Sequence, residues 1–467
     1  MRMLSSRFLL GSLASVAMMS VAGAADLPMK AKAPAVQYVK ICSLYGAGFY
    51  YIPGTDTCLK IGGFIRVDAH YGATAAPHES VDFTANYRSG NTRLFNTQTR
   101  AYATFDARSQ TAYGTLRSYF LTGGNSDNGA AFSAYMNRAF IQLAGFTWGL
   151  TDSIFDTYSA TPIHLNIVVA TNGSIGASGI WQWRYTAQFG NGMSASVAFE
   201  EPSRRDKAIN DGTFVRAAAP TCVVLPCPPA PLSPGLIRHG ERYPDVTAQI
   251  GASGTWGRVQ IAAAIHDASV GVSTAGTRLV AFPGQNRLGW AGMVGGLLNV
   301  PGMPGDTFGF QFTYAVGATG YVTGNVNTFG GADGNGMYRV IKGLIAAGGF
   351  VQDGALVGAS VEAMKAWGFE AGYRHAWTPT LSTSIAGGYV DLRQPSIAAM
   401  NSRVWNVGSR TLWSPVQNFS LGVDVLYTHI NGATGVALGG GGAPAGLTAG
   451  NVDVWTGMVR VTRSFWP

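Results

Sequence analysis

The chain has 467 residues, of which 47% are hydrophobic, 63 are glycine and only 12% are charged. Soluble domains typically carry about 25% charged residues and about 7% glycine, so this composition excludes a charged disordered protein and a coiled coil and argues against an ordinary cytosolic enzyme. The net charge of +8 does not indicate a nucleic-acid partner, because the 32 basic residues are scattered and form no polybasic run.

The first 24 residues have the three-part pattern of a secretory signal. Arg2 and Arg7 form a positive start, the stretch 8–21 is uncharged and mostly apolar, and Ala22-Gly23-Ala24 supplies the small residues that precede a cleavage site. We therefore expect a signal peptide over residues 1–24. The alternative, a membrane anchor, is disfavoured because the apolar stretch is short.

The four cysteines form two pairs along the chain. Cys42 and Cys58 bracket a segment rich in Gly, Tyr and Pro, and Cys222 and Cys227 close a proline-rich loop. An exported protein meets an oxidising compartment, in which such cysteines form disulfides. No CxxC pair occurs and no His lies near a cysteine pair, so we expect neither a metal site nor a cofactor.

From Cys58 onward, apolar and polar residues alternate with a period of two. Ile61, Ile65 and Val67, for example, alternate with Arg66 and Asp68. Each alternating segment runs roughly 8–11 residues, the length that a tilted membrane strand requires. Sixteen strands are predicted, at 58–71, 99–107, 111–121, 135–144, 149–155, 180–188, 193–200, 244–252, 258–267, 288–299, 307–318, 363–377, 381–391, 404–413, 419–429 and 452–465.

The connections between these segments alternate between short and long. Tight turns such as Asn191-Gly192 and Thr378-Pro379-Thr380 alternate with long polar or Gly-rich segments such as 201–243 and 320–361. This is the pattern of an all-β, antiparallel transmembrane barrel, with short periplasmic turns and long extracellular loops. We expect the barrel over residues 58–467, preceded by an N-terminal periplasmic segment over 25–57 that carries the first disulfide.

Several blocks of the sequence resemble a known family. Val39–Cys58, followed by Leu59-Lys60-Ile61-Gly62-Gly63, is similar to the alphaproteobacterial porins of rhizobia and brucellae (the Porin-2 type). Thr111–Arg117 and the ending Arg463–Pro467 resemble the same family. The resemblance implies a homotrimeric, 16-stranded porin of the bacterial outer membrane, surrounded by lipid and lipopolysaccharide. It also implies passive diffusion of small hydrophilic solutes and ions, and a third extracellular loop folded into the pore.

If the apolar face of the strands meets lipid, the opposite face lines the water-filled interior. A charge on the lipid side would cost about 2–4 kcal/mol per Arg at the midplane. The inward positions of the early strands form a predicted basic wall, made of Arg66, Arg100, Arg117, Arg138 and Arg184. Late strands add Arg374, Arg410 and Arg460, and inward acids include Asp68, Asp106, Glu200, Glu370 and Asp424.

The basic wall is expected to face a constriction loop over residues 152–179. Asp152 and Asp156 are the only carboxylates in this loop, and the rest of it is rather apolar. Opposed charges across a pore would order water and favour polar solutes. The pattern predicts a mildly anion-preferring pore; the alternative is that these arginines are isolated, solvated charges.

Two other functions fit parts of the pattern. One is a substrate-specific outer-membrane channel for a sugar or an anion. The other is an outer-membrane barrel enzyme, which would need Ser, His and an orienting group on adjacent strands. Ser194 and Ser196 have inward parity, but no His lies on the neighbouring predicted strands. We therefore expect a channel and not an enzyme.

Overall fold

The computed structural model describes most of the strands and part of the loops. The described residues are 40–71, 95–156, 179–205, 209–216, 232–237, 242–269, 287–323, 353–357, 360–394, 396, 401–431 and 451–465. The chain separates into two units, 1–40 and 41–467. All but one residue of the first unit, including the predicted signal peptide, lies outside the described residues, so the following concerns the second unit.

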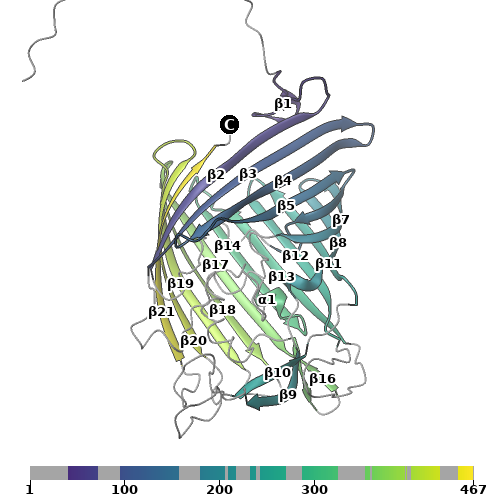
Figure 1. Cartoon of the computed structure of the whole chain (residues 1–467), viewed down its shortest axis with the longest axis vertical. Coiled ribbons are helices and arrows are strands. Elements are labelled where there is room, and N and C mark those ends of the chain that lie inside the picture. The colour runs from purple at the N-terminus through teal and green to yellow at the C-terminus, as the bar shows by residue number, and fades with distance from the viewer. Residues whose placement is uncertain are drawn as a thin grey trace, which may run out of the picture. The chain divides into compact units, whose positions relative to one another are not determined.

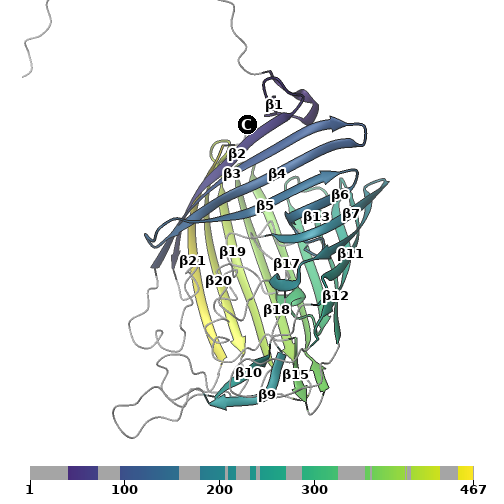
Figure 2. The same ribbon diagram turned by 45° about the vertical axis from the view of Figure 1, so that its right-hand side comes forward.

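Sixteen antiparallel strands form one closed barrel (Figures 1 and 2). The strands are β2 (Cys58–Tyr71), β3 (Phe95–Thr111), β4 (Gly114–Asp127), β5 (Ser133–Leu143), β6 (Phe146–Thr151), β7 (Ile180–Gly190), β8 (Met193–Glu200), β11 (Asp245–Gly254), β12 (Gly257–Asp267), β13 (Leu288–Asn299), β14 (Thr307–Val316), β17 (Lys365–Thr378), β18 (Leu381–Arg393), β19 (Ser402–Trp413), β20 (Phe419–Asn431) and β21 (Asn451–Ser464). Pairing of β21 with β2 closes the ring and leaves no free edge.

The predicted architecture and strand number are confirmed. The bounds of β2, β8 and β13 coincide with the predicted segments, and the other strands overlap theirs. The predicted bounds are least accurate for β6, which covers 146–151 and not 149–155. The strand starts directly after the turn at Ala144-Gly145, where both residues have positive φ, and pairs with β5 from Phe146 onward.

Exposure confirms which face of each strand points outward. On β2, Ile61, Ile65 and Val67 are 41%, 51% and 48% exposed, whereas Asp68, which follows Val67, is 1% exposed. The same alternation of exposed apolar and buried or half-buried polar side chains continues around the ring. Because an isolated barrel in water would bury such residues, the outer surface is suited to hydrocarbon.

The two ends of the barrel differ in their connections. Short turns join β3 to β4, β5 to β6, β7 to β8, β11 to β12, β13 to β14, β17 to β18 and β19 to β20, and we call this the turn end. Longer connections leave the opposite, loop end, except for the five residues between β4 and β5. The prediction of alternating short and long connections is therefore confirmed.

The long connections contain structure that the sequence did not predict. β9 (Ile209–Arg216), β10 (Leu232–Ile237), β15 (Gly354–Val357) and β16 (Ser360–Ala363) form a small four-stranded sheet, which lies at the end of the barrel opposite β1 (Figures 1 and 2). A short helix, α1 (Gly320–Thr323), and a 3-10 turn, η3 (Pro202–Arg204), lie in the same connections. No helix among the described residues is long and apolar enough to cross a membrane.

The turn between β13 and β14 is tied to β17 by one carboxylate. Asp306 accepts hydrogen bonds from the backbone N–H of Ala376 at 2.8 Å, from the His375 ring at 2.8 Å and from the Tyr373 hydroxyl. The Ala376 N–H, followed by the His375 and Tyr373 side chains, lowers the pKa of Asp306 to about 2. The carboxylate therefore stays charged and the turn stays attached to its neighbouring strand at any ordinary pH.

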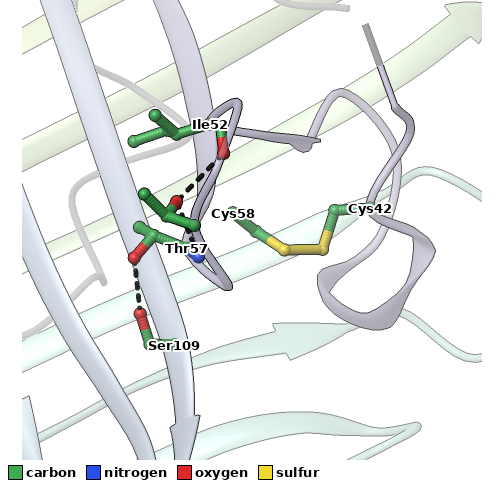
Figure 3. The surroundings of a disulfide bond; sticks show 6 residues. Cys42, Ile52, Thr57, Cys58 and Ser109 are labelled. Atoms are coloured by element: carbon green, nitrogen blue, oxygen red, sulfur yellow. Dashed lines mark hydrogen bonds between the residues drawn. A yellow bond between two sulfur atoms is a disulfide. The ribbon is translucent and has the colours of Figure 1, made fainter.

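A small lobe precedes the barrel at the turn end. It contains η1 (Ser43–Tyr45) and β1 (Tyr50–Tyr51), and the predicted Cys42–Cys58 disulfide joins its start to the start of β2 (Figure 3). Phe49 is buried against the disulfide. The inward-facing residues Lys60 and Arg108 contact the lobe: Lys60 donates to the Ala47 carbonyl at 3.0 Å, and the Arg108 guanidinium lies 4.9 Å from the Phe49 ring centre. Cys222 and Cys227 lie outside the described residues.

We expect the Cys42–Cys58 bond to stabilise the folded chain. It spans a sequence separation of 16 residues, and closing a loop of about that length contributes about 3 kcal/mol in the loop-entropy model. The double variant Cys42→Ser/Cys58→Ser should lose about that much free energy of unfolding and therefore unfold at a lower urea concentration. Tryptophan fluorescence in detergent measures the unfolding. Adding reductant to this variant measures any further stabilisation by a disulfide between Cys222 and Cys227. A urea midpoint of the double variant equal to that of the wild type would contradict the stabilising role of the Cys42–Cys58 bond.

Candidate pore-lining site

The five arginines of the predicted basic wall lie on strands of one side of the barrel. Arg66 lies on β2, Arg100 on β3, Arg117 on β4, Arg138 on β5 and Arg184 on β7, all with inward parity. Arg66 and Arg100 are directly opposite each other in the β2–β3 register, and Arg117 is opposite Arg108. Like charges in facing positions repel, so their partners decide whether the wall is stable.

Two carboxylates are each shared by two arginines. Asp106 accepts from Arg117 at 2.9 Å and from Arg108 at 2.7 Å. Asp68 lies 3.3 Å from Arg66 and accepts both Nε and Nη2 of Arg460, at 2.6 and 2.7 Å. Each group of three keeps one net positive charge inside the barrel.

The other wall arginines have different partners. Arg100 Nε donates to the neutral Asn125 Oδ1 at 2.6 Å, and Arg184 Nη2 contacts Thr147 Oγ1 at 3.4 Å. Arg138 instead forms an ion pair with Asp152, one of the two predicted acids of the constriction loop. The positive charge of the wall therefore comes mainly from β2, β3, β4 and β7.

Aromatic rings alternate with these arginines on the inner wall. The guanidinium of Arg66 lies 5.8 Å from the Phe64 ring centre, that of Arg100 lies 5.6 Å from Tyr102, and that of Arg117 lies 5.0 Å from Tyr119. These distances are within the range of cation–π attraction. The rings hold the guanidinium planes in place along β2, β3 and β4.

The segment after β6 turns into the barrel. Ser153 donates to the Glu200 carboxylate of β8, with 2.8 Å to each oxygen. Gln260, an inward residue of β12, donates to the Ile154 and Asp156 carbonyls at 3.3 and 3.2 Å. A contact from the end of β6 to the inner face of β12 passes β7, β8 and β11, so residues 152–156 start an inward-folded connection. Residues 157–178 of the predicted constriction loop lie outside the described residues.

The second predicted loop acid does not face open water. Asp156 forms an ion pair of 2.7 Å with Arg205, whose side chain is fully buried. Arg205 also lies 3.8 Å from Glu200 and 4.2 Å from the centre of the Tyr321 ring of α1, which in turn packs on Phe155. We call Asp156, Glu200, Arg205 and Tyr321 the inner cluster. It fastens the segment after β6 to the connections after β8 and β14.

A histidine and two further acids extend the inner cluster. His266 lies 2.7 Å from Asp245 and 3.4 Å from Asp353, and Tyr321 donates to Asp245 at 2.7 Å. All of these groups are buried. No pattern in the sequence marks Arg205, Tyr321, Asp245 or Asp353, since Arg205 lies in a polar stretch with no period and its partner Tyr321 lies more than a hundred residues away. Among the residues that the structure describes, no group of His, Cys, Asp and Glu could hold a metal ion.

A closed barrel with an inward-folded connection and a charged interior is the geometry of a porin. A sequence model of the porin subfamily matches residues 26–458. This chain belongs to that porin family. The predicted resemblance is confirmed, the protein is an integral β-barrel of the bacterial outer membrane, and family membership implies a channel rather than an enzyme.

Individual relatives support the assignment over part of their length. A putative outer membrane protein of Sinorhizobium fredii is 36% identical over 159 residues, which are 33% of this porin and 45% of the relative. The porin Omp2a of Brucella canis is 32% identical over 217 residues, 41% of this chain and 55% of the relative. The chain thus spans about half the length of the curated relatives it matches.

The fold also matches a solved structure. The outer membrane channel DcaP of Acinetobacter baumannii superposes with a TM-score of 0.60, covering 89% of this porin and 99% of that chain. Only 15% of the aligned residues are identical. The match therefore shows the shared barrel fold and not the solute.

Proposed function

We propose that this porin is a water-filled channel for the passive diffusion of small hydrophilic solutes and ions. The observation that carries the proposal is the charged inner wall of a closed barrel whose outer wall is apolar. Arg66 of β2 and Arg460 of β21 line the interior, while Ile65 and Val67, the two neighbours of Arg66 on β2, face outward. Such a division separates water inside from hydrocarbon outside.

The same proposal covers orientation, processing and assembly. Residues 1–24 are the signal peptide, residues 25–57 lie in the periplasm, and residues 58–467 form the barrel, with its turn end in the periplasm and its loop end at the cell surface. Outer-membrane lipid and lipopolysaccharide surround the outer wall. Membership of the porin family supports a homotrimer.

We propose a mild preference for anions. The shared carboxylates Asp68 and Asp106 leave a positive balance on the basic wall, and the loop acids Asp152 and Asp156 are each bound to an arginine. The loop acids therefore offer little negative potential to attract cations. A unit charge about 7 Å from the ion path contributes about 0.6 kcal/mol in water, enough for a roughly threefold change in local ion concentration.

Reversal potentials in a KCl gradient test this preference in planar bilayers. We expect Cl⁻ to be favoured, and we expect Arg100→Gln to reduce the Cl⁻/K⁺ permeability ratio roughly threefold. Arg100 is a suitable target because its hydrogen-bond acceptor, Asn125, is neutral and is not left as an uncompensated charge. Arg463→Gln, on the outward parity of β21, is the matched control and should leave the ratio unchanged. A wild-type preference for K⁺ would refute the basic-wall proposal.

A second candidate is a substrate-specific channel for an anion or a sugar. It is favoured by the guanidinium–ring contacts on β2, β3 and β4, which form a polar and aromatic track. Liposome swelling with neutral and anionic solutes of graded size separates the two. Rates that follow solute size support the general porin, whereas rates that depart from size order support the specific channel. We propose no catalytic activity.

A further inference from the structure

A row of aromatic residues crosses the outer wall near the loop end of β17 to β21. The row has one residue per strand: Trp367, Tyr389, Trp405, Tyr427 and Trp455. Neighbouring ring centres lie 5.1 Å apart for Trp367–Tyr389, 5.2 Å for Trp405–Tyr427 and 5.0 Å for Tyr427–Trp455, and Tyr389 faces Trp405 in the register. Aromatic rows of this kind lie where hydrocarbon meets the polar headgroups.

Basic residues follow this row on the side of the loop end. Lys365 precedes Trp367 by two residues on β17, Arg403 precedes Trp405 by two on β19, and Arg393 lies four residues beyond Tyr389 on β18. Two residues of a strand span about 7 Å, so the cations lie at the depth of the headgroups. Lys365 faces Arg393 in the β17–β18 register, and both are exposed.

One buried carboxylate orients the two guanidinium groups. Asp391 accepts Arg393 Nε at 2.6 Å, Arg393 Nη2 at 3.0 Å and Arg403 Nε at 3.1 Å. Its side chain is 2% exposed, whereas those of Arg393 and Arg403 are each 56% exposed. Within the described residues, Nη1 of Arg393 and both Nη groups of Arg403 donate no hydrogen bond. The arrangement presents outward-facing donors with a net positive charge.

The chemistry of this patch selects an anion with several oxygens. Guanidinium groups bind phosphate through paired N–H donors, and a charge on the lipid-facing wall is tolerated near the interface and not at the midplane. The anions available at that depth are the phosphates of lipid headgroups. The acyl chains of such a lipid would lie against the exposed apolar residues that continue toward the midplane, among them Phe369, Val407 and Val425.

We propose that Lys365, Arg393 and Arg403 form a binding site on the outer wall for a phosphate of an outer-leaflet glycolipid. Asp391 positions the two guanidinium groups, and the aromatic row contacts the upper part of the acyl chains. The site lies on the outer surface, so it is separate from the basic wall inside the barrel. It rests on the proposed orientation, in which the loop end faces the cell surface.

Titration with lipid A tests the site in detergent, with Trp367 and Trp405 as fluorescent reporters. The probes are bis-phosphoryl lipid A and the same lipid with both phosphates removed. We expect wild-type protein to bind the phosphorylated probe at least tenfold more tightly. In the double variant Arg393→Gln/Arg403→Gln, this ratio should fall to about one. Asp391→Asn, which keeps both cations but releases them, should give an intermediate ratio.

Arg463→Gln is the matched control, because Arg463 is an outward arginine at the turn end of β21; its ratio should stay at the wild-type value. An unchanged ratio in the double variant, or equal binding of both probes by wild-type protein, would overturn the proposal. A smaller oligomer in the double variant, independent of lipid, would assign the patch to a contact between copies instead. Single-channel conductance of the double variant should equal that of wild type, so loss of the lipid site and failure of the porin proposal are distinguishable.

Discussion

Replacing Asp68 with asparagine should lower the free energy of unfolding of the barrel by about 3–5 kcal/mol, because it leaves buried cations without their anion. Asp68 is fully buried on β2 and binds Arg460 of β21 through two hydrogen bonds across the strand pair that closes the ring. Arg66 lies 3.3 Å from the same carboxylate. Asparagine has nearly the same shape, so the loss measures charge and not packing. Urea unfolding in detergent and the temperature of the mobility shift on SDS gels report it.

Asp106→Asn is the control, because it removes a carboxylate that is shared by two arginines but lies away from the strand pair that closes the ring. Asp106 also binds two arginines, Arg108 and Arg117, but it lies within the β3–β4 hairpin and the arginine side chains are 26% exposed. Water can solvate those cations once the carboxylate charge is gone, so the loss should be clearly smaller. Equal losses for Asp68→Asn and Asp106→Asn would show that neither the deeper burial of the Asp68 group nor its position at the ring closure adds to the cost of removing a shared carboxylate.

Replacing Arg205 with methionine should release the inward segment after β6. The guanidinium of Arg205 binds Asp156 at 2.7 Å and lies 4.2 Å from the Tyr321 ring centre, so it joins three connections. Methionine fills much of the volume but leaves Asp156 and Glu200 uncompensated, at a cost of about 3 kcal/mol or more. We expect a larger single-channel conductance with a broader distribution, because residues 153–156 lose the Asp156–Arg205 ion pair and keep only their hydrogen bonds to Glu200 of β8 and Gln260 of β12.

Two further variants separate anchoring from a general loss of stability. Arg205→Lys keeps the charge and should retain a conductance closer to that of wild type. Arg258→Met makes the same change at an inward position near the turn end of β12, and should leave the width of the conductance distribution unchanged. A wild-type distribution in Arg205→Met would show that the inner cluster does not hold the segment.

The barrel could be predicted from the sequence because solvation acts on each strand separately. Lipid outside and water inside impose a period of two on every strand, and the bounds of β2, β8 and β13 follow directly from that period. The prediction was weakest for β6, which has only six residues. So few residues contain too few alternations to mark either end, and the polar Asp152-Ser153 that follows extends the apparent pattern.

The structure in the long connections could not be predicted in this way. The small sheet joins Ile209 of one connection to Gly354 of another, and no solvent boundary imposes a period on these residues. The same holds for α1, whose Tyr321 is buried where three connections meet around Arg205.

The sequence alone determined the fold class and the number of strands, because a strand that separates lipid from water records that division in its own residues. Only the tertiary structure decided the ion-pair partners of the arginines. Asp68 and Arg460 are separated by 392 positions and meet through closure of the ring, and Asp156 meets Arg205 because two connections fold inward. Such pairs depend on the register and packing of distant segments, and no local pattern encodes them.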